Sequence, residues 1–134
     1  MNKESIMRTV YKVLMDKGYN PKRIKNCDGE PSLSFKIDIM PMYVIPVDGY
    51  IDITFYVTLP SSKSVSADIE KLISRHDFMH LSGIEHLDNI ESAIYIISFN
   101  LFVFDLKHLQ VIIDYAIGTI NACISDLMCY VLKN

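Results

Sequence analysis

Residues 50–59, with the sequence YIDITFYVTL, are the stretch that decides the fold of this chain. Apolar side chains occupy every second position, which is typical of an antiparallel strand with one face toward the core and one face toward water. The core side is predicted to consist of Ile51, Ile53, Phe55, Val57 and Leu59, and the opposite side of Tyr50, Asp52, Thr54, Tyr56 and Thr58. A one-residue slip in pairing would exchange the two sides, so the register should be well specified.

The residues before this strand predict a helix and then hairpin strands. Residues 3–17 carry apolar side chains at helical spacing, and Gly18 and Pro21 are suited to stop the helix. Asp28-Gly29 is a turn signal between a short polar strand at about 22–27 and a second strand. The buried side of that second strand is predicted to be Leu33, Phe35, Ile37 and Ile39.

Two prolines distinguish the next segment. Pro41 and Pro46 bracket residues 42–45. Because proline cannot donate a hydrogen bond to a sheet ladder, they predict an edge strand or a bulged one. Asp48-Gly49 is then the hairpin turn into residues 50–59.

The second half of the chain predicts a helix, a strand and a long helix. Ser66 is a suitable N-cap for a helix over residues 67–80, which Ser82-Gly83 would end. Residues 92–104 form a strand with apolar side chains on both faces, and Asp105 then caps a long amphipathic helix over residues 106–132.

This order of elements predicts one α+β domain over residues 1–134. An antiparallel sheet would be packed by an N-terminal helix, a short middle helix and a long C-terminal helix. A chain of 134 residues is long enough to bury a sizeable core.

Composition argues against several classes of function. The net charge of -3 and the scattered basic residues argue against binding to nucleic acid. The longest apolar run, near residues 101–104, is far shorter than the roughly 20 residues of a membrane span, so no membrane insertion is expected. The N-terminus shows no secretory signal, and Cys27, Cys123 and Cys129 lack metal-ligand spacing. A cytoplasmic protein with reduced thiols is expected.

The pair His76 and His80 is the sharpest candidate for chemistry. On a helix, side chains four residues apart share a face and could bind one metal ion, and Asp77 after the first histidine resembles the H-E-x-x-H pattern of zinc proteases. The acid is one methylene shorter than glutamate, the pair lies at the end of its predicted helix, and no third ligand is obvious. A small metal-dependent enzyme that uses His76 and His80 is therefore the alternative hypothesis, beside a reading of the pair as the edge of the core.

Other catalytic arrangements are missing from the sequence. There is no G-x-S-x-G and no glycine-rich phosphate loop, so acyl transfer and nucleotide chemistry lack their usual scaffolds. Cys123 and Cys129 fall on or near the apolar side of the last helix, where a buried and inert thiol is expected. The sequence thus predicts no catalytic residue and no cofactor.

Several segments together resemble the YbjN-like family and the related type III secretion chaperone fold. These segments are Lys17-Gly18-Tyr19 after the first helix, the Asp28-Gly29 hairpin into residues 33–37, Leu59-Pro60 at the end of the central strand, the helix from Ala67, and residues 99–102 before the last helix. The resemblance covers nearly the whole chain and implies a fold like that of small acidic homodimeric chaperones, which bind partner proteins without hydrolysing nucleotide. It supplies no catalytic residue.

The sequence therefore favours a non-enzymatic protein-binding module, chaperone-like or regulatory, that acts as a homodimer. The strand at 92–104 and the helix after it carry more apolar surface than a chain of this length is expected to cover. Either helices cover both faces of the strand or another chain covers one of them, and a protein partner or a second copy is expected there. The candidate partner-binding residues are Tyr95, Ile97, Phe99, Leu101 and Phe102, together with Tyr50 and Tyr56 on the polar side of residues 50–59.

Overall fold

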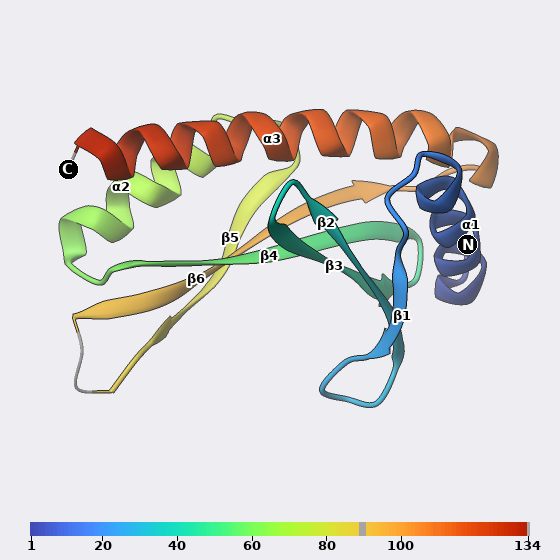
Figure 1. Cartoon of the computed structure of the whole chain (residues 1–134), viewed down its shortest axis with the longest axis horizontal. Coiled ribbons are helices and arrows are strands. Elements are labelled where there is room, and N and C mark those ends of the chain that lie inside the picture. Colours follow the sequence, from blue (N-terminus) through green and yellow to red (C-terminus); the bar gives the residue numbers. More distant parts are fainter. Residues whose placement is uncertain (89–90, 134) are drawn as a thin grey trace.

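The computed structural model describes residues 1–88 and 91–133, which form an α+β fold of three α-helices and one six-stranded antiparallel sheet (Figure 1). The elements follow in the order α1 (Lys3–Asp16), β1 (Lys22–Lys25), β2 (Pro31–Ile37), β3 (Met40–Val47), β4 (Tyr50–Pro60), α2 (Lys63–Ile73), β5 (Met79–His86), β6 (Ser92–Phe102), the 3-10 turn η1 (Leu106–His108) and α3 (Leu109–Lys133). The strand order in the sheet is β1-β2-β3-β4-β6-β5. The predicted fold class is confirmed.

Strand β4 is the centre of the sheet, as its alternating sequence predicts. It pairs with β3 on one side and along its whole length with β6 on the other, from Tyr50 opposite Phe102 to Pro60 opposite Ser92. Ile51, Ile53, Phe55 and Leu59 are buried. Strand β4 thereby fixes which face of every neighbouring strand points to the core.

The prediction of an edge strand or a bulged one for the proline-flanked segment is wrong, because β3 lies inside the sheet and pairs in a continuous register with both neighbours. Its pairing with β2 runs from Met40 to Val44, and its pairing with β4 runs from Tyr43 to Val47. Pro41 therefore belongs only to the first ladder and Pro46 only to the second. Successive residues of a strand direct their backbone nitrogens to opposite neighbouring strands. The nitrogen of each proline can therefore point toward the neighbour with which that part of β3 does not pair.

The second strand ends earlier than its alternation suggests. Strand β2 stops at Ile37, and Asp38, with a φ of 55°, begins a tight turn into β3. Ile39 lies in that turn and is 90% exposed, so its predicted place in the core is wrong. Ile39 continues the alternating sequence pattern beyond Asp38, but the strand itself does not continue.

The predicted helix over residues 67–80 is also misplaced. Helix α2 begins at Lys63 because the Ser62 hydroxyl accepts a hydrogen bond from the Val65 N–H, and it ends at Ile73. Residues 79–86, partly assigned to that helix, instead form β5 and pair with β6, with an irregularity between Leu81 and Gly83. Pairing with β6 makes this segment a strand, because one edge of β6 would otherwise leave a full row of backbone N–H and C=O groups unpaired.

The helices all pack on one face of the sheet. Figure 1 shows α3 lying along the sheet, with α1 near one end of it and α2 near the other. Helix α1 buries Ile6, Val10 and Leu14, as the predicted helix over residues 3–17 requires. Beneath the helices lie the buried side chains of the sheet, which include Leu33, Phe35, Met42, Val44, Ile53, Phe55, Tyr95, Ile97 and Phe99.

Helix α3 is the most apolar element. Together with η1 it is long and apolar enough to cross a membrane by length and composition, which is weak evidence on its own because a core helix meets the same test. Seven of its residues are buried, and they lie on the side that faces the sheet and the other helices. Packing of this kind accounts for part of the apolar composition of α3, while Val111, Met128, Val131 and Leu132 are exposed.

Tyr95 ties the far end of the sheet to α2. Its ring is fully buried, while its hydroxyl donates to the Pro60 carbonyl oxygen at 3.0 Å and accepts from the Ser66 hydroxyl at 3.0 Å. One side chain of β6 therefore connects the end of β4 with the first turns of α2.

Tyr95→Phe should lower the free energy of unfolding by about 1 kcal/mol, because two partly buried groups lose their partner. The matched control is Tyr50→Phe, since Tyr50 is 43% exposed and its hydroxyl forms no hydrogen bond within the described residues. The control should change the stability by less than about 0.5 kcal/mol. Urea denaturation followed by circular dichroism measures both, and equal effects would contradict the role given to the Tyr95 hydroxyl.

Candidate functional site

The sheet face opposite the helices carries an exposed group of aromatic side chains. On β4, Tyr50 and Tyr56 alternate with the buried residues and so point away from the helices. The register places Phe102 of β6 opposite Tyr50. It places Tyr43 of β3 opposite Thr54, two residues before Tyr56 on the same face of the sheet. We call the residues Tyr43, Tyr50, Tyr56, Phe102 and Phe104 the open-face aromatics.

The open-face aromatics form two groups in edge-to-face contact. Tyr43 and Tyr56 have ring centroids 5.6 Å apart, and Tyr50 and Phe102 have centroids 5.4 Å apart. Phe104, which is 82% exposed, packs on Phe102 at 4.6 Å. Edge-to-face pairs hold their rings in fixed orientations, so these side chains offer a preformed surface to another molecule.

A row of hydrogen-bonded polar side chains crosses the sheet between the two aromatic groups. Thr54 Oγ1 donates to Asp52 Oδ1 at 2.8 Å and lies 2.8 Å from Ser98 Oγ. Ser82 Oγ donates to Ser98 Oγ at 2.6 Å and lies 3.2 Å from His80 Nε2. The row thus runs from β5 through β6 to β4.

The number of protons fixes the direction of this row. Each hydroxyl has one proton to donate. The Thr54 proton goes to Asp52, so Ser98 donates to Thr54, and the Ser82 proton goes to Ser98, so Nε2–H of His80 donates to Ser82. A serine nucleophile would instead donate to the histidine that activates it. The row therefore satisfies polar groups on the sheet and is not arranged as a nucleophile with its base.

Tyr56 is the one open-face aromatic residue with a shifted acidity. Partial burial raises its pKa above the usual value, and the neighbouring Tyr43 and the Asp52 carboxylate act in the same direction. Its hydroxyl therefore stays protonated at neutral pH and can donate a hydrogen bond to an approaching molecule.

The structure divides the predicted partner-binding residues between two faces. Tyr50, Tyr56 and Phe102 are exposed on the open face, each between 43% and 46%. The remaining four lie on the helix side: Leu101 is partly buried, and Tyr95, Ile97 and Phe99 are fully buried.

The prediction that Tyr95, Ile97 and Phe99 contact a partner is therefore corrected. These residues are core residues, because the helices cover their face of β6. Tyr43 and Phe104 are open-face residues that the sequence analysis did not single out. Phe104 could have been identified because it lies two residues after Phe102, the spacing that places strand residues on one face. Tyr43 was missed because β3 was wrongly predicted to be an edge strand.

The two candidate metal ligands do not share a helical face, since α2 ends at Ile73. His76 lies in the connection after α2 and its Nε2 is 2.7 Å from Asp126 Oδ2 of α3, whereas His80 is on β5. Among the described residues, no group of three or more histidine, cysteine, aspartate or glutamate side chains could hold a metal ion. The geometric premise of the metal-enzyme alternative is therefore wrong.

The cysteines differ in their exposure. Cys123 is buried in α3, and burial raises the pKa of its thiol to about 12, with a further contribution from Asp126. Cys27 and Cys129 are exposed, so the expectation of a buried thiol is met by Cys123 and not by Cys129. A thiol that is buried and protonated is a poor nucleophile.

Comparisons with known proteins bear on the fold. A scan against protein-family models and a search of curated proteins gave no match. Among solved structures the chain is similar to "YbjN, a putative transcription regulator from E. coli", with a TM-score of 0.65, 13% sequence identity, and coverage of 92% of this chain and 91% of that chain. The resemblance to a YbjN-like fold is thereby confirmed, and at this identity the similarity speaks for the fold alone.

A thiol reagent such as 5,5′-dithiobis(2-nitrobenzoate) should label Cys27 and Cys129 of the native protein within minutes. Cys123 should react only after unfolding in guanidinium chloride, because its thiol is buried and its pKa is about 12. Mass spectrometry of the labelled peptides identifies the sites. Rapid labelling of Cys123 in the native protein would contradict its burial.

Proposed function

We propose that this chain is a non-enzymatic protein-binding module, chaperone-like or regulatory, which holds an apolar segment of a partner protein on the open face of its sheet. The observation that carries the proposal is the set of open-face aromatics on a face that none of the helices in the described part of the chain covers. Tyrosine and phenylalanine are enriched in protein interfaces, where they supply a large contact area at a low cost in side-chain entropy.

The polar row supports this proposal. The aromatic groups on either side of it can exclude water from the contact, which strengthens hydrogen bonds made within it. The row leaves its hydroxyls satisfied before a partner arrives, so burying them does not strand an unpaired donor. Tyr56 and Asp52 at its border remain able to bond a partner.

The resemblances are consistent with the same proposal. The sequence resemblance to the type III secretion chaperones implies binding to a partner protein, and the solved structure of similar fold is described as "a putative transcription regulator". The net charge of -3 favours a protein over a nucleic acid as the partner of this chain. We place the activity in the cytoplasm, as the sequence suggests.

The homodimer is proposed to form through the outer side of α3. Val111 and Leu132 are 69% and 84% exposed there, and Met128 and Val131 are also exposed. These four large apolar side chains lie along one helix and are not among its buried residues. Water is excluded from them if a second copy packs against the same surface, as a two-fold interface requires.

Peptide selection tests the open face as the binding surface. A phage-displayed random peptide library panned on the immobilised protein should yield peptides rich in apolar and aromatic residues. The double variant Tyr56→Ala/Phe102→Ala should bind them at least about tenfold more weakly, because two aromatic anchors typically contribute more than 1 kcal/mol each. Fluorescence anisotropy of labelled peptides measures the affinity.

The matched control for peptide binding is Ile39→Ala, which removes a 90% exposed apolar side chain in the β2–β3 turn. It should leave the affinity unchanged. The proposal fails if the selected peptides bind the double variant as well as the wild type, provided that circular dichroism shows both proteins folded.

Light scattering coupled to size-exclusion chromatography tests the dimer. The wild type should elute with twice the mass of the 15.4 kDa chain, and Val111→Asp/Leu132→Asp should elute as a monomer because it would bury two charges at the interface. The control Ile39→Asp adds a charge at an exposed apolar site elsewhere and should stay dimeric. A monomeric wild type at tens of micromolar would overturn the α3 interface.

A further inference from the structure

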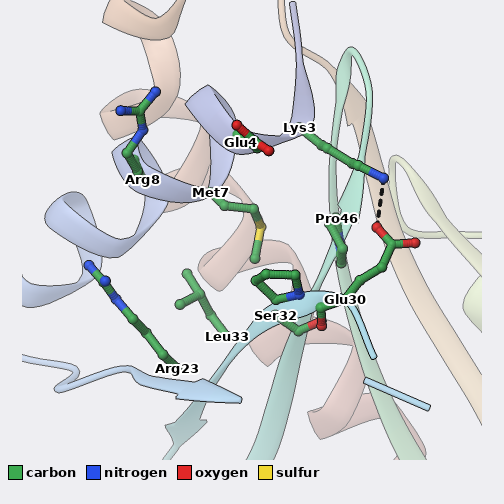
Figure 2. A pocket seen from close by; sticks show the side chains of 10 residues that line it. Lys3, Glu4, Met7, Arg8, Arg23, Glu30, Ser32, Leu33 and Pro46 are labelled. Carbon is green, nitrogen blue, oxygen red and sulfur yellow. Dashed lines mark hydrogen bonds and ion pairs between the residues drawn. The ribbon is translucent and has the colours of Figure 1, made fainter. Parts of the chain in front are cut away.

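A cleft of about 390 Å³ lies on the helix side of the sheet, between α1 and the strands β1 to β3 (Figure 2). Its size falls within the range of roughly 300–1,000 Å³ that small-molecule sites occupy. It is separate from the open-face aromatics, which point to the opposite side of the sheet.

The cleft exists because β1 extends beyond the part of the sheet that α1 covers. Helix α1 packs on β2, β3 and β4. On β1, the residue that faces the helix side opposite the buried Leu33 is Arg23, whose guanidinium lies 4.4 Å above the ring of Tyr11. This contact joins β1 to α1 through the length of an arginine side chain and not through close apolar packing, so space remains between the two elements.

The floor of the cleft is apolar. Met7 from α1, Leu33 from β2 and Pro46 from β3 line it, and Leu33 belongs to the hydrophobic core with only 3% of its surface exposed. Met7 packs against the same core. The hydrocarbon part of a ligand placed here would pack against the core and lose its contact with water, which is favourable.

The cations of the cleft are not all compensated. Lys3 Nζ is 2.6 Å from Glu30 Oε2, and this pair occupies one end of the cleft in Figure 2. Arg8 and Arg23 lie toward the other side, and neither forms an ion pair with a carboxylate within the described residues. Glu4 also lines the cleft, so its lining carries three cations against two carboxylates, an excess of one positive charge. In a chain of net charge -3, two guanidinium groups without a carboxylate partner beside an apolar floor favour an anionic ligand.

We propose that this cleft binds a small amphipathic carboxylate of the fatty-acid type. Its carboxylate lies at Arg8 and Arg23, and its hydrocarbon body lies on Met7, Leu33 and Pro46. Guanidinium groups suit this ligand because their planar donors match the two oxygens of a carboxylate. The Lys3–Glu30 pair bounds the cleft opposite the arginines, which favours a ligand of limited length over a continuous polypeptide.

Isothermal titration calorimetry with octanoate and decanoate, each below its micellar concentration, tests the proposal. Both should bind with one site per chain, and decanoate should bind roughly tenfold more tightly because it buries two further methylene groups. Octanol, which has the same apolar body without the charge, should bind at least tenfold more weakly than octanoate.

Variants place the ligand. Arg8→Ala/Arg23→Ala should weaken the binding of decanoate at least tenfold, and Met7→Trp, which fills the cleft without changing its charge, should abolish it. The matched control Arg75→Ala removes the remaining arginine of the chain, outside the cleft, and should have no effect. Circular dichroism confirms that each variant is folded.

Three results would overturn the carboxylate site. These are the absence of saturable decanoate binding, equal binding by the wild type and the double arginine variant, and loss of binding in Tyr56→Ala/Phe102→Ala instead. The last result would move the acyl chain to the open face. Since the two sites lie on opposite faces of the sheet, failure of the carboxylate site leaves the proposed binding of a partner protein unaffected.

Discussion

The pairing of β4 with β6 is the constraint on which the rest of the structure depends. The two strands run antiparallel over their full lengths, so one register assigns each of their side chains to the helix side or to the open side. Phe55 and Ile97 meet beneath the helices, while Thr54 and Ser98 meet on the other face and share a hydrogen bond of 2.8 Å. A slip of one residue would bury those hydroxyls under helices and expose the core rings, so apolar burial and polar pairing enforce the same register.

The one-sided helix layer explains why an apolar surface remains. A sheet with both faces covered would bury the open-face aromatics, whereas here their face ends at solvent. The two edges of the sheet are protected from adding further strands: β1 is short and carries Lys22 and Lys25, and β5 is irregular between Leu81 and Gly83. Contact with another protein is thereby directed to the faces of the molecule and away from its strand edges.

Much of the fold could be predicted from the sequence, and the failures have physical causes. Residues 50–59 and 3–17 carry patterns whose period alone decides their structure, and both predictions held. The segment around His76 and His80 failed because its outcome depends on pairing with β6, a partner distant in the sequence that local helical spacing cannot reveal. Pro41 and Pro46 misled for a related reason, since each lies in one ladder only and the staggered ends of β2 and β4 are set by tertiary register. The candidate site was half predictable: alternation identified Tyr50 and Tyr56, but could not say which face of β6 the helices would cover.

Both proposed sites arise because the helices cover only part of the surface of the sheet. At the β1 edge the sheet extends past α1, and Arg23 occupies a position where an apolar residue would have closed the cleft. On the opposite face none of the described helices packs, and aromatic residues occupy positions where lysine or threonine would have sufficed for a solvated sheet. In each case apolar surface stays accessible that a complete layer of helices would bury. Accessible apolar surface of this kind is expected to mark sites of interaction, which is why binding is proposed at the uncovered surfaces of this sheet.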